Sequence, residues 1–231
     1  MIVYGKNSCE EILKSSEKIK KLYLDRNFSD KNIISLIEKR GLKPIFYTKV
    51  ELDEVADGNH QGIIIDMGEY NYCDIDDILD DNGFIVILDH LEDTHNFGAI
   101  IRTCEAAGVS GIIIPKDRSV RVNSTVMKTS SGAAIRMKIC MVTNINQTIK
   151  YLQDKDYYIT STDMGGENYT KVDYTGKTAI VIGNEGSGVA ELTKKLSDHI
   201  VSIPMIGKID SLNASVAAGI LIYEVVRQRS V

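Results

Sequence analysis

The chain has 231 residues, and its 43% of hydrophobic residues can fill one large core or two smaller ones. No apolar run approaches the roughly 18 residues of a membrane span, and residues 1–6 lack the basic start and apolar stretch of a secretion signal, so we expect a cytoplasmic protein that does not enter the membrane. The net charge of −5 argues at first against a nucleic-acid-binding protein, because phosphate binding usually leaves a basic footprint.

The charges are distributed unevenly, which weakens that objection. Residues 1–50 hold eleven Lys and Arg against six Asp and Glu, whereas residues 51–80 hold none against ten. A basic first segment followed by an acidic one is typical of a small RNA-docking module and its connector. A solvated surface without a binding role is the alternative interpretation.

Residues 1–70 predict a small α/β domain. The expected elements are a helix from about Ser8, a strand near 21–24, a helix over 30–40 and strands at 45–47 and 62–65. Residues 71–82 are polar and acidic and precede Gly83, so we interpret them as a linker with room for one helical turn at 76–79.

Residues 83–231 follow a different pattern, in which short, continuously apolar strands alternate with helices. Such strands are buried on both faces, so we expect a mostly parallel sheet with helices on both faces. The predicted strands lie at 84–88, 111–114, 138–142, 157–161, 178–182 and 200–203.

A first candidate site segment, residues 89–102, follows the strand at 84–88. We expect a helix from Asn96, an acceptable N-cap, with one apolar stripe. Arg102 lies some 150° from the centre of that stripe, at about 100° per residue, with only Ala99 and Ala106 beside it. An arginine between alanines indicates a partner that approaches closely, and a solvated surface arginine is the alternative. The stripe consists of Phe97, Ile100, Ile101 and Cys104.

A second segment, Gly183 to Gly188, ends the strand at 178–182 and contains three glycines. Ligands of open α/β sheets bind outside the carboxyl ends of strands, and glycines let the backbone come close to a ligand. The spacing is neither that of dinucleotide binders nor that of a P-loop. A plain tight turn therefore stays an equal alternative.

A third segment runs from Ile203 to Ser215 and leads into a helix that is apolar nearly all round up to Ile222. Such a helix should be buried within the fold or against a second subunit. Ser211, Asn213 and Ser215 stand at its start, where they either cap the helix or line a polar pocket.

In this order the three segments resemble motifs 1, 2 and 3 of the SpoU (TrmH) branch of the SPOUT methyltransferases. The family signature is Asn-x-Gly-x-x-x-Arg, then Asn/Ala-Glu-Gly-x-Gly, then Ile-Pro-Met followed by Ser-Leu-Asn-x-Ser, and the match runs through residues 84–229. Residues 1–70, with Tyr4-Gly5 and His60-Gln61-Gly62, resemble the ribosomal-protein-like (L30e-like) substrate-binding domain of the 23S rRNA guanosine 2′-O-methyltransferase subfamily. In one departure Thr94 stands where the family usually has proline, a change that removes no functional group.

The resemblance implies an α/β knot, a deep C-terminal trefoil that is a rare exception to unknotted topology, with S-adenosylmethionine bound in it. The residues expected to bind this cofactor are Gly183, Ile203, Leu212, Met205, Ile182, Gly186 and Ser161. Those expected to be catalytic are Arg102, Asn96, Glu185, Ser211 and Asn213.

The resemblance also implies a homodimer that methylates the ribose 2′-hydroxyl of a nucleotide, guanosine in the subfamily, in structured RNA, with rRNA favoured over tRNA. Arg102 would either stabilise the developing alkoxide or accept the proton; we favour the electrostatic role, because a guanidinium with a pKa above about 12 is a poor base. The chemistry requires neither a metal nor a redox cofactor.

Two interpretations from other classes remain. The chain could be an RNA-binding or ribosome-assembly factor that has kept this fold without the reaction, or a nucleotide-dependent α/β enzyme. The five expected catalytic residues occur together, which disfavours the first, and the dinucleotide and P-loop fingerprints do not occur, which disfavours the second.

The cysteines and histidines are scattered, so we expect reduced thiols that fill apolar gaps and histidines with structural or surface roles, with no metal site. These residues are Cys9, Cys73, Cys104, Cys140, His60, His90, His95 and His199.

Overall fold

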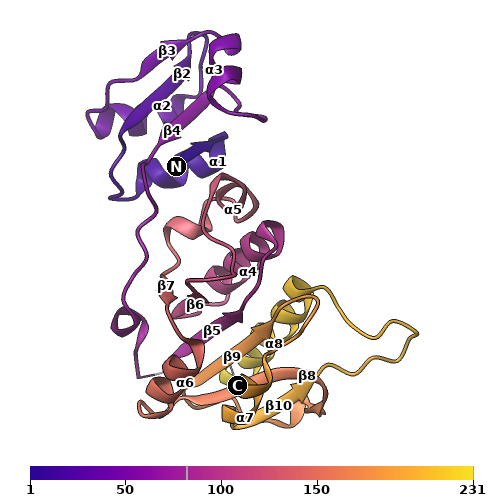
Figure 1. The fold of residues 1–231 in the computed structure, drawn as a ribbon. Coiled ribbons are helices and arrows are strands. Elements are labelled where there is room, and N and C mark those ends of the chain that lie inside the picture. The colour runs from indigo at the N-terminus through magenta and orange to yellow at the C-terminus, as the bar shows by residue number, and fades with distance from the viewer. Residues whose placement is uncertain (82, 231) are drawn as a thin grey trace. The chain divides into compact units, whose positions relative to one another are not determined.

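The computed structural model describes residues 1–81 and 83–230, so Asn82, which ends the expected linker, and Val231 lie outside the described residues. The chain forms two compact units, one made of residues 1–71 and 121–136 and the other of residues 72–120 and 137–231 (Figure 1). In the described part of the chain, no helix has the length and apolarity needed to cross a membrane.

The first unit contains a four-stranded sheet in the order β1-β4-β2-β3, in which β4 is antiparallel to β1 and β2, and β2 is parallel to β3. Its elements are β1 (Ile2–Tyr4), α1 (Lys6–Lys14), β2 (Lys21–Asp25), α2 (Lys31–Lys39), β3 (Ile45–Tyr47), α3 (Lys49–Val55), β4 (Ile63–Asp66), α5 (Ser124–Thr129) and η2 (Ala133–Ile135).

Strand β4 shows that both faces of this sheet are covered. Ile63, Ile64 and Ile65 are all fully buried, although successive side chains of a strand point to opposite faces. Ile64 packs with Leu52 of α3, and α1 packs against β4 and against α2. The small α/β domain expected from the sequence therefore has its own core.

The second unit contains a six-stranded sheet in the order β10-β8-β9-β5-β6-β7, and every neighbouring pair is parallel. Its elements are η1 (Ile75–Ile78), β5 (Phe84–Asp89), α4 (Thr94–Ala106), β6 (Gly111–Pro115), β7 (Ile139–Val142), α6 (Ile145–Gln153), β8 (Tyr158–Asn168), η3 (Tyr169–Lys171), β9 (Thr178–Gly183), α7 (Glu191–Leu196), β10 (His199–Ser202) and α8 (Ala214–Arg229). The predicted α/β class with a mostly parallel sheet is confirmed.

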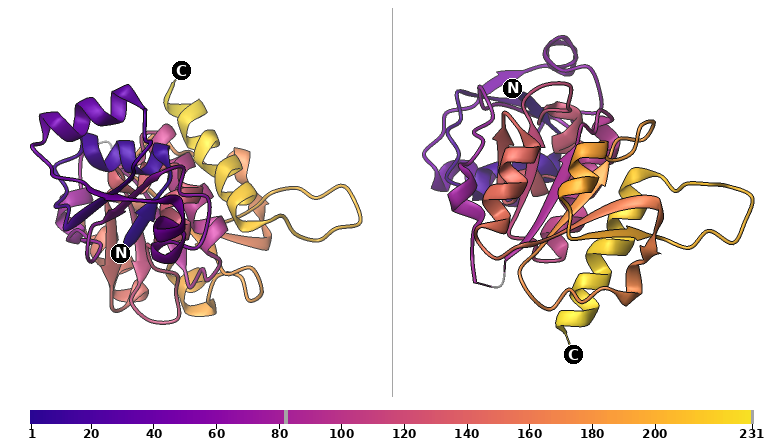
Figure 2. Two further views of the ribbon diagram at one scale, coloured as in Figure 1. Left: turned by 90° about the horizontal axis from the view of Figure 1, so that it is seen from above. Right: turned by 60° about the horizontal axis from the view of Figure 1, so that its bottom comes forward.

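The connections of this sheet place its helices in two layers. The chain runs outward from β5 through α4 to β6, and in the opposite direction from β7 through α6 to β8 and from β9 through α7 to β10. Because crossovers between parallel strands are right-handed as a rule, these opposite directions place α4 on one face and α6 and α7 on the other. Accordingly α4 packs with α8, whereas α6 packs with α7 (Figure 2). The central strand β5 is buried along its whole length, as its apolar sequence predicts.

Strand β8 is longer than its apolar run. The sequence predicts a strand that ends at Ser161, but β8 continues to Asn168 and pairs again with β10 after a register shift between Ile200 and Val201. Gly166 permits this crossing, because a Cβ there would lie 2.6 Å from the carbonyl oxygen of Ile200. Beyond β10 the chain leaves the sheet in a long loop before α8 (Figure 2), and Ile206 in this loop is 99% exposed.

All four cysteines are free, as predicted. Cys9 and Cys104 are buried among apolar side chains, and this burial raises the pKa of both thiols. Cys73 lies beside β7, where its Sγ is 2.7 Å from Sγ of Cys140. The sequence spacing gives no sign of that contact.

Candidate active site

A cavity of about 750 Å³ lies at the carboxyl ends of β9 and β10 in the second unit. Its walls come from four segments: residues 162–164 of β8, residues 182–188 at the end of β9 and in the turn after it, residues 201–205 at the end of β10 and beyond it, and five residues around the start of α8, namely Asp210, Ser211, Leu212, Ala214 and Ala217. The volume falls within the range of about 300–1,000 Å³ that small-molecule sites occupy. The second and third candidate segments thus share one ligand-sized site.

The helix of the first segment begins earlier than predicted. Asp93 is the N-cap of α4, and its Oδ1 accepts a hydrogen bond of 2.6 Å from the backbone N–H of Asn96. The expectation that Asn96 caps the helix is therefore wrong; a carboxylate three residues earlier caps it and also interacts favourably with the helix dipole. Thr94 takes the first helical position, where a proline would fit without losing a hydrogen bond.

Because Asp93 caps the helix, the side chain of Asn96 is available to join the three candidate segments. Its Nδ2 donates to Oε1 of Glu185 at 2.8 Å, and its Oδ1 accepts from Nδ2 of Asn213 at 2.9 Å. Asn213 also caps α8 through its Oδ1, which accepts from the backbone N–H of Ser215. The capping role and the site role considered for Asn213 therefore coexist in one side chain.

The turn after β9 is held by its own asparagine. Oδ1 of Asn184 accepts from the N–H of Gly186, and its Nδ2 donates to the carbonyl of His90 at 2.8 Å. Gly183 has no room for a side chain, because a Cβ would lie 2.2 Å from the carbonyl carbon of Gly188. The segment is therefore both a tight turn and a wall of the cavity, and Glu185 projects from a fixed backbone.

A buried carboxylate behind the turn supports this arrangement. Asp89, at the end of β5, is 2% exposed. Its Oδ2 accepts from the backbone N–H of Ala190 at 2.9 Å, and its Oδ1 lies 2.6 Å from Nδ1 of His90. His90 thus has a structural role, as expected from the sequence.

The charged side chains that line the cavity are all acidic: Asp163, Glu185 and Asp210. The ammonium of Lys194 lies 2.8 Å from Oδ2 of Asp163 and lowers the pKa of that carboxyl, so Asp163 stays ionised at neutral pH. An acidic lining suits a ligand that carries positive charge.

Most of the predicted cofactor residues line this cavity, and one does not. Ser161 is fully buried, and its hydroxyl bonds to that of Ser197. The next three residues, 162–164, line the cavity instead; the sequence prediction missed them because it ended the strand at Ser161. Glu185 and Ser211 of the predicted catalytic set also line the cavity. The cofactor residues that line it are Ile182, Gly183, Gly186, Ile203, Met205 and Leu212.

Arg102 takes the position on α4 that the helical pattern predicts. Phe97, Ile100, Ile101 and Cys104 are buried, and Arg102 on the opposite side is exposed. Arg102 is not among the residues that line the cavity. Within one chain, therefore, the structure unites Asn96, Glu185 and Asn213 but does not bring Arg102 to the cavity wall.

The sequence matches two family models. Residues 83–223 match the SpoU rRNA methylase family, and residues 2–73 match the family described as RNA 2′-O ribose methyltransferase substrate binding. The 23S rRNA (guanosine-2′-O-)-methyltransferase RlmB of Escherichia coli K12 is 37% identical over 241 residues, which cover 99% of each chain. The enzyme of the same name from Coxiella burnetii is 38% identical over 238 residues, covering 98% of this chain and 95% of the relative.

The fold of the chain is also similar to that of a solved SpoU methyltransferase. The SpoU methyltransferase AviRb of Streptomyces viridochromogenes, in complex with AdoMet, superimposes with a TM-score of 0.87 at 25% sequence identity. The match covers 100% of this chain and 90% of AviRb, so it includes both units.

Proposed function

The chain belongs to the SpoU rRNA methylase family and is an S-adenosylmethionine-dependent RNA methyltransferase, and on that premise we propose that it methylates the ribose 2′-hydroxyl of a guanosine in 23S rRNA in the cytoplasm. The observation that carries the proposal is the pair of hydrogen bonds by which Asn96 joins Glu185 and Asn213 beside the acidic cavity. Two full-length relatives named as 23S rRNA enzymes support rRNA over tRNA.

The cavity fits the proposed cofactor in size and charge. S-adenosylmethionine supplies an electrophilic methyl group on a positively charged sulfonium. The carboxylates of Glu185 and Asp210 complement that charge, whereas Asp163 already pairs with Lys194, and the Gly183 turn allows close approach of the backbone. We assign cofactor binding to the six predicted residues that line the cavity and replace Ser161 by its neighbour Asp163.

The catalytic residues act by placement and charge. Asn96 orients Glu185 and Asn213 through its two hydrogen bonds, and Ser211 lies on the cavity wall. Arg102 orients the RNA phosphate and stabilises negative charge that develops on the 2′-oxygen. Because Arg102 does not line the cavity of its own chain, we propose that Arg102 and the cofactor meet at the interface of a homodimer.

The C-terminal helix supports the homodimer. Val216 and Tyr223, seven residues apart on one face of α8, are each 50% exposed, so the helix expected to be buried has an uncovered apolar face in the single chain.

We expect size-exclusion chromatography with light scattering to give twice the chain mass of 25.6 kDa. Val216→Asp with Tyr223→Asp should yield monomers, whereas the control Leu192→Asp, at a 56% exposed position on α7, should stay dimeric. A monomeric wild-type protein would contradict the proposal.

We also propose that the C-terminal segment forms the deep trefoil knot of the family. The match to the family model over residues 83–223 and the superposition on AviRb with a TM-score of 0.87 support this proposal. For the division of the chain by function we propose residues 1–70 as the RNA-binding domain, 71–82 as the linker and 83–231 as the catalytic domain; residues 121–136 of the catalytic part pack in the same compact unit as residues 1–71.

The proposed function is tested in two steps. Calorimetry should detect binding of S-adenosylhomocysteine, with NAD as the negative control. The protein is then incubated with labelled S-adenosylmethionine and rRNA from a strain that lacks it, and the labelled position is mapped. A 2′-O-methyl group on one guanosine of 23S rRNA is the expected result; labelled tRNA would redirect the substrate assignment, and a methylated base, or cofactor binding without transfer, would refute the reaction.

A further inference from the structure

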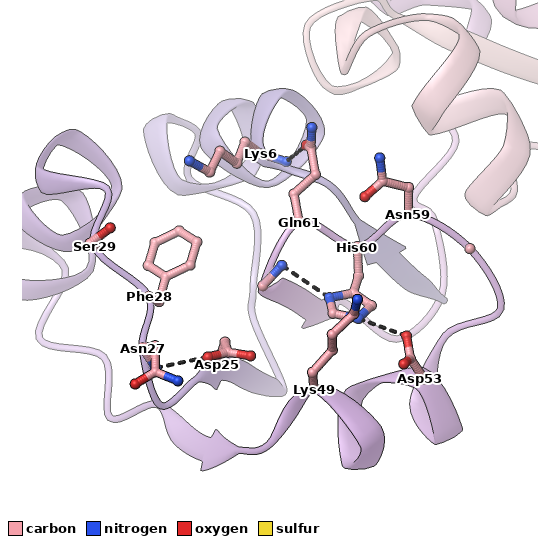
Figure 3. A pocket seen from close by; sticks show the side chains of 12 residues that line it. Lys6, Asp25, Asn27, Phe28, Ser29, Lys49, Asp53, Asn59, His60 and Gln61 are labelled. Atoms are coloured by element: carbon pink, nitrogen blue, oxygen red, sulfur yellow. Dashed lines mark hydrogen bonds and ion pairs between the residues drawn. The ribbon is translucent and has the colours of Figure 1, made fainter.

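The first unit contains a separate cavity of about 570 Å³ (Figure 3). It lies between the loop that follows β2, with Asp25 and Phe28, and the loop that precedes β4, with His60 and Gln61. Lys49, the first residue of α3, completes it from below in the view of Figure 3. The volume suits one small ligand or one building block of a polymer.

Fixed loops form this cavity. His60 is only 5% exposed; its Nδ1 accepts from the backbone N–H of Gly62 at 3.0 Å, so its Nε2 carries the proton and donates to Oδ1 of Asp53 at 3.0 Å. Oε1 of Gln61 accepts from the backbone N–H of Lys6 at 2.8 Å. The backbone N–H of Asp25, at the end of β2, donates to the carbonyl of Gly62 at 2.8 Å, so the two loops and the start of α1 are joined before any ligand arrives.

Phe28 is an aromatic side chain in an otherwise polar cavity. Its ring packs on Gly62, where a Cβ would lie 3.0 Å from Cδ2 of Phe28, so the backbone supports one part of the ring. The ammonium of Lys6 lies 5.6 Å from the ring centroid and pairs with Asp30 at 3.1 Å. Phe28 is only half-buried, and Figure 3 shows its ring directed towards the space between the two loops.

The charges in the cavity are nearly balanced. Asp25 accepts from the backbone N–H of Asn27 at 2.8 Å and Asp53 from His60, and these carboxylates offset the lysines that line the same space. Lys6 is already paired with Asp30, whereas Lys49 is exposed and forms no ion pair within the described residues 1–81 and 83–230. A ligand here would therefore gain more binding energy from stacking on the ring and from hydrogen bonds to its polar edges than from charge. Of the described lysines that line the cavity, Lys49 is the one available to bind a phosphate.

We propose that this cavity holds one unpaired nucleotide of the RNA substrate, with the base stacked on Phe28 and a phosphate beside Lys49. The inference deepens the proposed function, on which it rests. A base can enter such a site only when it is free of a helix, and proteins read unpaired bases by stacking them on aromatic rings and bonding their edges. Asp25 and Asn27 offer an acceptor and an amide for that edge.

The test compares Phe28→Ala and Phe28→Leu with Phe46→Ala, a control in the same unit at a 57% exposed phenylalanine of β3 that does not line the cavity. Full-length proteins are titrated with 23S rRNA transcript, with a 12-nucleotide single strand and with its duplex. Both Phe28 variants should bind the transcript and the single strand about 10-fold more weakly, since stacking contributes about 1–3 kcal/mol per base, with duplex binding unchanged. Phe28→Leu keeps the apolar packing on Gly62 and so separates the loss of the aromatic face from misfolding.

Lys49→Ala should weaken binding of the 12-nucleotide single strand. It should also lower the magnitude of the slope of log affinity against log salt concentration by about the amount expected for one phosphate contact. In the methyl-transfer assay the Phe28 variants should raise KM and leave kcat and the affinity for S-adenosylhomocysteine unchanged. The proposal would be overturned if Phe28→Leu bound the RNA with wild-type affinity or if Phe46→Ala lost as much RNA affinity as the Phe28 variants. It would also be overturned if free GMP bound the protein without weakening RNA binding. An inactive wild-type protein with a Phe28-dependent affinity for RNA would refute the proposed reaction and not the nucleotide site.

Discussion

Arg102→Ala should lower the rate of methyl transfer by a factor of about 10²–10³, the usual cost of removing one donor that stabilises charge in a transition state. In the proposed mechanism Arg102 acts on the RNA phosphate and on the charge of the transition state, so the affinity for S-adenosylhomocysteine should stay within about twofold of wild type. Single-turnover rates at saturating RNA, together with calorimetry, measure the two quantities separately.

Arg102→Lys tests how the guanidinium acts. Lysine keeps the positive charge but loses the planar fork that binds a phosphate through two parallel hydrogen bonds, so we expect it to restore less than about a tenth of the lost rate. Lys150→Ala, at an exposed cation on α6 that does not line the cavity, serves as the control and should be fully active. A lysine variant with most of the wild-type turnover would argue against bidentate geometry.

Asn96→Asp should lower the rate by about 10²-fold at neutral pH and recover part of it as the pH falls. The substitution replaces the N–H donor with a carboxylate 2.8 Å from Oε1 of Glu185, and repulsion between the two carboxylates raises the pKa of the pair. At lower pH a shared proton restores a hydrogen bond between positions 96 and 185, so the rate of the variant should rise as the pH falls.

The measurement is the ratio of mutant to wild-type rate across a pH series, which cancels any common pH dependence of the reaction. Asn96→Ala has no proton to share and should give a low and constant ratio. A constant ratio for Asn96→Asp as well, or wild-type activity at neutral pH, would show that the bond to Glu185 does not organise the site.

The parallel sheet was predictable because its strands can be recognised from their amino-acid composition. Strands such as β5 and β9 are apolar throughout, as burial on both faces requires, and their predicted ranges agree with the structure to within a residue. The long arm of β8 was not predictable. Residues 162–168 are mostly polar and contain two glycines, and the end of this arm, Glu167 and Asn168, pairs with β10.

Short elements of the first unit were missed for a related reason. β1 has three residues and α3 has seven, too few to establish a period. A local signal for α3 existed, since Thr48 and Glu51 form a capping box at its start. In the active site the pattern of α4 predicted which residues are exposed, but the choice between Asp93 and Asn96 as the cap depended on contacts with Glu185 and Asn213 from distant parts of the chain.

The first unit takes residues 121–136 from the middle of the sequence, and this has a consequence for recombination between relatives. Ser8 donates to the carbonyl of Met127, Arg136 pairs with Glu11, and Tyr70 donates to the carbonyl of Ala134. A chimera joined at the linker would inherit its α1 from one parent and its α5 from the other. The two segments therefore have to be exchanged together, and natural variation in one should be accompanied by compensating variation in the other.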